Sequence, residues 1–158
     1  MHPITRILCP VDLSLASAGA LKYADVLARA CGARLVVLHA FDLPETLDVP
    51  GQTHPADPDV ERHFHEFTKL SPGVEVERIL HAGSPGEVIC WAAAKRGCDL
   101  IVMGTHGRTG LMHLLLGSVT EHVVRHAQCP VLTVRHQLTT DPEPVEPLVV
   151  PLPAPSMM

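Results

Sequence analysis

Residues 98–120 read CDLIVMGTHGRTGLMHLLLGSVT. The stretch opens with a compact apolar segment, continues with three glycines spaced three residues apart, and ends in a second apolar run before Gly117 and Ser118. The segment 98–103 predicts a buried strand, and Ser118 predicts the start of a helix. A strand that leads through a glycine-rich loop into a helix is typical of α/β proteins.

The rest of the chain repeats this alternation. Apolar segments predict further strands at 4–11, 33–40, 74–80 and 130–135. The predicted helices run from Ser14 or Ser17 to Gly32, from Pro58 to Pro72, over 84–97, and from Ser118 to about Ala127. The order βαβαβαβαβ implies one open, five-stranded parallel sheet with helices on both faces, on which Trp91 is expected to pack.

Two of the predicted helices begin with a capping signature. SPGE at 84–87 and SVTE at 118–121 both place a serine three residues before a glutamate. In a capping box these two residues satisfy backbone N–H groups at the helix start. Ser84 and Ser118 are therefore the predicted N-caps.

Composition restricts the class of protein. The chain has 158 residues, of which 46% are apolar and 18% charged, so it folds around a core. We expect one domain over residues 1–136 and, because 142–155 contains six prolines, a flexible tail over 137–158. A net charge of −5 argues against a nucleic-acid surface, but it leaves room for one phosphate ligand held by backbone amides.

The expected location is the cytoplasm. Five cysteines without a CxxC pair are typical of free, buried thiols in a reducing compartment. The first twelve residues lack the apolar core of a signal peptide, and no apolar run approaches the roughly 18 residues that span a membrane.

The glycine stretch predicts a site for a polyphosphate. In an open α/β sheet, ligands bind beyond the carboxyl ends of the strands, where Gly104 lies. Glycine permits positive φ and close approach of a ligand, and the helix start at Gly117 and Ser118 favours an anion. The sequence lacks a P-loop, and its GxxGxxG follows the fourth strand rather than the first, unlike a dinucleotide fingerprint. The alternative is a tight loop followed by a helix cap.

One gapped motif carries a family resemblance. Gly104, two residues, Gly107, nine residues, then Gly117-Ser118 is the nucleotide signature of the universal stress protein family, which the chain resembles over 4–135. ILCPVDLS, DLIVMGTHG and CPVLTVR extend the resemblance. It implies an adenine nucleotide alpha hydrolase-like sheet in the order 3-2-1-4-5. It also implies ATP binding, with Mg²⁺ or Mn²⁺ carried by the phosphates, and a homodimer formed through 130–135.

The resemblance also implies residue roles. Asp12 would lie beside the ribose and adenine, or alternatively cap the helix before Ser14. Ala40 stands where the family often has valine and would use backbone atoms towards adenine. The residues that would line the base are Pro10, Val11 and Met103. The phosphates would face Gly104, His106, Gly107 and Arg108 on one side, and Gly117, Ser118, Val119 and Thr120 on the other.

The motif favours a switch over an enzyme. ATP hydrolysis needs a positioned water and a metal ligand set, whereas the motif offers amides, Ser118 and Arg108 without a dedicated acidic ligand. We therefore expect a nucleotide-dependent stress or regulatory protein with little or no turnover. The alternatives are a slow ATPase or nucleotidyl-transfer enzyme, in which His106 could accept a proton, and an apo dimeric interaction scaffold. His122 and His126 could share a metal, but a solvated surface pair is the more ordinary interpretation.

Overall fold

A computed structural model describes residues 3–42, 56–70, 72–105 and 116–135. Within these ranges strands and helices alternate along the chain, as the sequence predicts. They are β1 (Arg6–Pro10), α1 (Leu15–Cys31), β2 (Arg34–Phe41), α2 (Pro58–Phe67), β3 (Val76–Ala82), α3 (Pro85–Arg96), β4 (Leu100–Gly104), α4 (Ser118–His126) and β5 (Val131–Val134). The predicted tail, 137–158, and most of the predicted loop at 41–56 lie outside the described residues.

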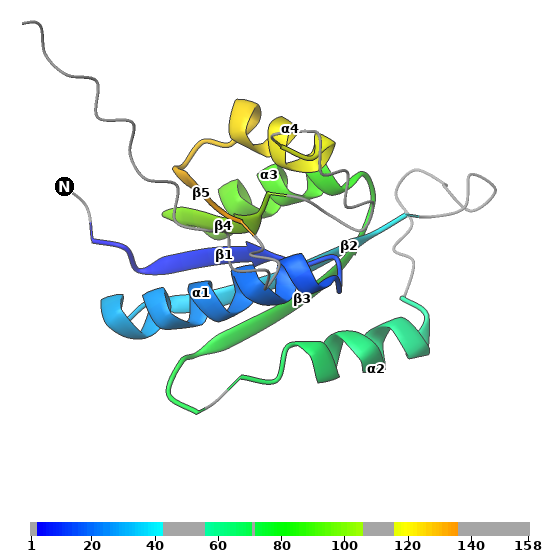
Figure 1. Cartoon of the computed structure of the whole chain (residues 1–158), viewed down its shortest axis with the longest axis horizontal. Coiled ribbons are helices and arrows are strands. Elements are labelled where there is room, and N and C mark those ends of the chain that lie inside the picture. Colours follow the sequence, from blue (N-terminus) through cyan, green and yellow to red (C-terminus); the bar gives the residue numbers. More distant parts are fainter. Residues whose placement is uncertain (1–2, 43–55, 71, 106–115, 136–158) are drawn as a thin grey trace, which may run out of the picture.

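The five strands form one parallel sheet in the order β3-β2-β1-β4-β5 (Figure 1). This confirms the order implied by the family resemblance. From β1 the sheet extends to β2 and β3 on one side and to β4 and β5 on the other. The helix that follows β1, α1, and the helix that follows β4, α4, therefore cover opposite faces of the sheet. Open sheets of this kind bind ligands in the crevice beyond the carboxyl ends of such a strand pair. The glycine motif directly follows β4 and therefore lies at that edge.

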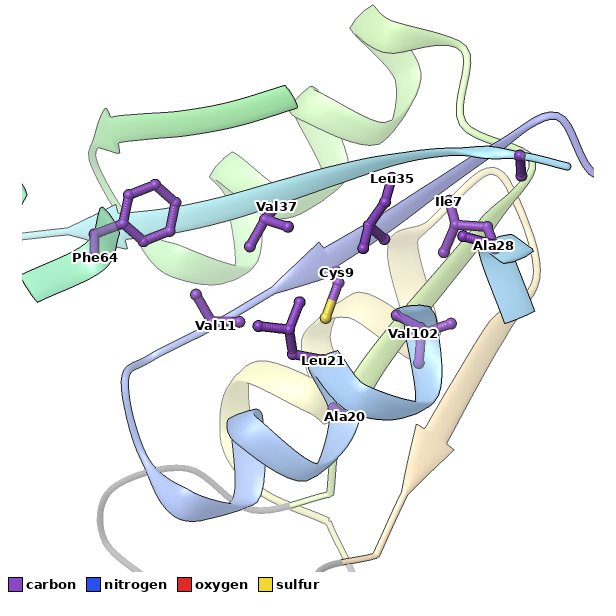
Figure 2. Close-up of a cluster of buried hydrophobic side chains, with 12 residues drawn as sticks. Ile7, Cys9, Val11, Ala20, Leu21, Ala28, Leu35, Val37, Phe64 and Val102 are labelled. Atoms are coloured by element: carbon purple, nitrogen blue, oxygen red, sulfur yellow. The ribbon is translucent and has the colours of Figure 1, made fainter. Parts of the chain in front are cut away.

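Two aliphatic clusters cover the two faces of the sheet. Side chains from β1 and β2 that point to one face pack against α1 and against Phe64 of α2. Figure 2 shows Cys9 of β1 pointing towards Leu21 of α1 in this cluster. The alternate side chains, such as Leu8, pack with α3 and α4 on the other face. Each fully buried Val, Leu or Ile stabilises the fold by about 1.5–3 kcal/mol relative to an exposed one.

The starts of the helices correct part of the sequence analysis. Ser14 caps α1, because its side chain accepts from the backbone N–H of Ser17, and Gly32 ends the helix with φ +64°. Ser84 is the N-cap of α3 but makes no side-chain capping bond, so the predicted capping box is not formed. The N-cap of α4 is Gly117, and Ser118 is the first helical residue. The prediction that Ser118 caps α4 is therefore wrong by one position.

Three further observations concern the surface and the thiols. Trp91 contacts the sheet through the edge strand β3, where its ring lies 4.7 Å from that of His81, and it remains 47% exposed. All five cysteines are free thiols. None of the helices in the described ranges is long and apolar enough to cross a membrane.

Candidate functional site

The two ends of the glycine motif meet at the carboxyl end of β4. The backbone N–H of Thr105 donates to the carbonyl oxygen of Val134 over 3.1 Å, and the Thr105 carbonyl accepts from the N–H of Gly117 over 2.7 Å. Thr105 is only 4% exposed, so both bonds are shielded from water. The predicted phosphate-facing residues between the two ends, His106, Gly107 and Arg108, lie outside the described residues.

Thr120 fixes the start of α4 to the end of β4. Its hydroxyl donates to the carbonyl oxygen of Gly104 over 2.9 Å, and the residue is 3% exposed. A buried hydroxyl that lacked this partner would cost about 1–3 kcal/mol. The side chain of Thr120 therefore positions the motif, and its backbone N–H is the group that remains for a ligand.

The first turn of α4 presents a set of open donors. Among the described residues, no acceptor takes a hydrogen bond from the backbone N–H of Ser118, Val119 or Thr120. The first intrahelical bond is that of Glu121 to the Gly117 carbonyl, and a glycine N-cap supplies no side-chain oxygen. Unpaired N–H groups and the helix dipole make this turn a place for an anion.

Gly117 acts differently from the sequence-based expectation. Its own N–H is occupied by Thr105, so the donors available for an anion begin one residue later, at Ser118. Its φ is −69°, which any L-residue can adopt, so a positive φ does not explain the glycine. The expectation that a ligand approaches the backbone closely at this glycine remains a prediction.

Asp12 takes part in the turn that follows β1. Its Oδ1 accepts from the backbone N–H of Ser14 over 3.1 Å and from the Ser14 hydroxyl. Leu13 between them has φ +65°, a left-handed conformation that costs a residue with a Cβ about 1–2 kcal/mol. Ser14, and not Asp12, is the N-cap of α1, so the Asp12 carboxylate supports the turn before the helix rather than capping it. Strained backbone of this kind gathers at functional sites.

Ala40 presents an unpaired peptide edge beside this turn. The backbone N–H of Arg34 points towards β1 and that of Leu35 points towards β3. The backbone N–H groups of the even-numbered residues of β2 therefore point towards β1. The last bond between β1 and β2 runs from Val11 N–H to the Leu38 carbonyl, over 2.8 Å. Ala40 comes next on that side, and no described residue accepts from its N–H. Its backbone is therefore open at the carboxyl edge.

The predicted apolar lining does not form one wall. Val11, which follows Pro10, is 4% exposed and packs with α1 and α2 on one face of the sheet. Met103, at 5% exposure, packs in the other cluster together with Ala40 and Val119. Side chains alternate between the faces of a strand, which separates Val11 from Met103. Of the predicted lining, only Met103 lies in this cluster, together with Ala40, predicted to contact adenine, and Val119, predicted to face the phosphates.

His39 is a buried polar residue at the site that was not predicted from the sequence. This residue is 6% exposed, its Nδ1 lies 2.8 Å from the carbonyl oxygen of Val11, and its ring is stacked 6.1 Å from that of Phe64. The available signal was a lone polar residue in an otherwise apolar segment, LVVLHA. A buried polar side chain in such a strand needs a specific partner.

The two histidines of α4 pair with each other. The rings of His122 and His126 stack at 4.3 Å, and Nδ1 of His126 lies 2.8 Å from the His122 carbonyl. That contact directs one ring nitrogen of His126 to the backbone. Within the ranges that the structure describes, no three His, Cys, Asp or Glu side chains are grouped so that they could hold a metal ion.

Comparisons with known proteins agree with this architecture. Residues 3–135 match the model of the Universal stress protein family. Universal stress protein MJ0531 of Methanocaldococcus jannaschii is 32% identical over 138 residues, covering 82% of this chain and 81% of that protein. The solved structure of universal stress protein UspA from Lactobacillus plantarum superposes with a TM-score of 0.68 at 27% identity, covering 85% of this chain and 100% of that one.

A third comparison shows the shared fold at lower identity. A universal stress protein solved in complex with cAMP has a TM-score of 0.66 and 23% identity to this chain, and the match covers 84% of this chain and 98% of that one. The sheet order, the glycine motif at the end of β4 and the match over nearly the whole described core lead to one conclusion. The chain belongs to the universal stress protein family.

Proposed function

We propose that this protein binds ATP at the carboxyl edge of β1 and β4 and acts as a nucleotide-dependent regulatory protein in the response to stress, with little or no turnover. The observation that carries the proposal is that the backbone N–H groups of Ser118, Val119 and Thr120 have no acceptor among the described residues. They lie next to the hydrogen bond between Gly117 and Thr105 that joins the two ends of the glycine motif. A donor row of this kind at a helix start fits a phosphate chain without any lysine.

The triphosphate is the part of the ligand that these amides would hold. Hydrogen bonds to a charged group contribute about 1.5–3 kcal/mol each, so three amides would contribute about 4.5–9 kcal/mol of the roughly 8 kcal/mol that micromolar binding requires. The exposed hydroxyl of Ser118 lies on the same turn. His106, Gly107 and Arg108 of the motif are proposed for the other side of the phosphates. Mg²⁺ or Mn²⁺ would be coordinated mainly by phosphate oxygens and water.

Adenine would be recognised by the backbone of Ala40. Its open N–H matches the acceptor N1 of adenine, and its carbonyl matches the exocyclic amine. Guanine has a donor, N1–H, and an acceptor, O6, at these two places. The backbone N–H of Ala40 would then face another donor, and its carbonyl would face another acceptor. Asp12 is proposed beside the ribose, because a carboxylate accepts several hydrogen bonds at once. The structural neighbour that holds cAMP is consistent with an adenine ligand.

The composition of the glycine motif supports low turnover. Residues 104–120 contain no Asp or Glu, and Glu121, which follows them, forms an ion pair with Arg125 over 2.8 Å. Hydrolysis would require an acidic group poised on a metal or a water. We therefore place this protein with nucleotide-binding switches rather than with ATPases.

We further propose that the protein is a cytoplasmic homodimer that pairs through β5. This short apolar strand forms one edge of the sheet, and an open edge offers unpaired backbone groups to a second copy. The five free thiols suit a reducing compartment. Sedimentation at micromolar concentration should give the mass of a dimer, and a monomer would contradict the pairing.

The test of the central proposal compares nucleotides. Purified protein is heated with ATP, GTP or neither at matched concentrations in the presence of Mg²⁺. ATP should raise the melting temperature and GTP should raise it much less, while phosphate release should not increase linearly with time. Equal stabilisation by both nucleotides would overturn the adenine assignment, and steady release of phosphate would show an ATPase.

A further inference from the structure

His39, near the end of β2, lies at the point where the hydrogen-bond ladder between β1 and β2 ends. The Val11 carbonyl can only accept, so Nδ1 of His39 carries a proton and donates to it over 2.8 Å. Within the described part of the chain, this is the hydrogen bond that the His39 ring makes, and the ring also stacks on that of Phe64. The bond is shielded from water, because His39 is 6% exposed.

In a regular parallel ladder that carbonyl would have another partner. After the bond from Val11 N–H to the Leu38 carbonyl, the next bond would run from Ala40 N–H to the Val11 carbonyl. The pairing stops instead at Pro10 with Leu38, and the side chain of His39 supplies the donor for Val11. One side-chain bond thus takes the place of one ladder bond.

We propose that His39 is a positioning residue that ends the β1–β2 ladder one bond early and so keeps the backbone of Ala40 open for the adenine ring. The inference rests on the proposed function. In it, His39 affects only the binding of the adenine base, whereas the amides of α4 bind the phosphates. The same bond anchors the Val11 carbonyl, which directly precedes Asp12 and the strained turn at Leu13.

This role predicts that replacing His39 weakens binding of the adenine base and not binding of the phosphates. His39→Leu fills a similar volume against Phe64 but removes the donor, so the Val11 carbonyl becomes available to the Ala40 N–H. His39→Asn is the matched control, because its amide nitrogen stands near the place of Nδ1 and restores a donor. Neither change touches α4, so inorganic tripolyphosphate, which has no base, serves as the probe of the phosphate half.

The experiment measures the affinities of ATP and tripolyphosphate for the three proteins, together with amide hydrogen exchange at Ala40 without ligand. In His39→Leu, we expect a loss of ATP affinity of about tenfold or more, as for one lost hydrogen bond. Tripolyphosphate affinity should be unchanged, and exchange at Ala40 should become slower. His39→Asn should resemble the wild type.

The outcomes separate this inference from the proposed function. Equal losses for ATP and tripolyphosphate in His39→Leu, or an unchanged Ala40 exchange rate, would overturn the positioning role and leave the nucleotide site standing. A wild-type protein that bound neither ligand would overturn the proposed function, and this inference with it.

Discussion

The backbone N–H of Gly117 donates to the carbonyl oxygen of Thr105 over 2.7 Å, and this bond joins the two ends of the glycine motif. It holds the first turn of α4 beside the end of β4, with Thr120 bonded to Gly104 as a second tie. These two hydrogen bonds occupy the N–H of Gly117 and the hydroxyl of Thr120, which would otherwise be available to a ligand. The donors left open, at Ser118, Val119 and Thr120, are thereby fixed in place before a ligand arrives.

The first prediction tests this bond with two substitutions at one position. Gly117 has φ −69°, which suits both proline and alanine. Gly117→Pro removes the N–H that donates to Thr105, and because the Thr105 carbonyl is buried, we expect the free energy of unfolding to fall by about 1–3 kcal/mol relative to Gly117→Ala. Gly117→Ala keeps the donor and should retain the bond. Urea unfolding measures both, and equal stability of the two variants would contradict a structural role for the bond.

The second prediction concerns the contact between α3 and α4. A Cβ added at Gly86 would lie 2.7 Å from Cδ2 and 2.8 Å from Cγ of His122, which is closer than side chains pack. Gly86→Ala should therefore destabilise the protein by about 1–3 kcal/mol, despite the better helix propensity of alanine. The strain should be relieved when His122→Ala is added.

The control for this pair is a double-mutant cycle. If His122 is the obstacle, the effect of Gly86→Ala should become small or favourable in the His122→Ala background. Additive effects of the two substitutions would show that Gly86 is needed for another reason.

The third prediction is a pH dependence that comes from Cys9. Burial raises the pKa of this thiol from an ordinary 9.0 to about 12. Between these values the unfolded chain loses the proton while the native protein keeps it. The stabilisation is thus fully present below about pH 9 and is lost as the pH rises towards 12, by up to about 1.4 kcal/mol per pH unit.

Cys9→Ala serves as the control for the alkaline slope. The variant is less stable throughout because it leaves a small cavity, but it has no thiol to titrate at this position. The free energy of unfolding is measured with urea at pH 8, 9 and 10. It should fall less steeply with pH for the variant, by up to about 1.4 kcal/mol per pH unit, which corresponds to one proton. Parallel slopes would contradict the assignment.

Residue pattern was sufficient to predict the architecture. The alternation of apolar segments with capped helical segments located all nine elements of the described residues, and the gapped motif with Gly104 and Gly117 placed the candidate site at the end of β4. These features are local in sequence, so they can be read without knowing the packing. Strand β3 was displaced by two residues, because its limits depend on pairing with β2 from Val76 to Ala82 rather than on its own composition.

The finer assignments at the site required coordinates. Whether Ser118 or Gly117 is the N-cap depends on backbone dihedrals that the capping signature does not determine. That Thr120 bonds to Gly104, and that His39 takes the Val11 carbonyl, depends on contacts between residues far apart in sequence. The separation of Val11 from Met103 follows from strand alternation once the register of β1 and β4 is known.

The most direct test of the central claim is a titration of isotope-labelled protein with Mg²⁺ and ATP, followed by the NMR signals of individual backbone amides. We expect the amides of Ser118, Val119 and Thr120 at the start of α4, together with that of Ala40 at the end of β2, to shift most and to saturate along one binding curve. Tripolyphosphate should move the α4 amides and leave Ala40 nearly unchanged. Shifts absent from these four amides, or gathered at the opposite edge of the sheet, would contradict the proposed site.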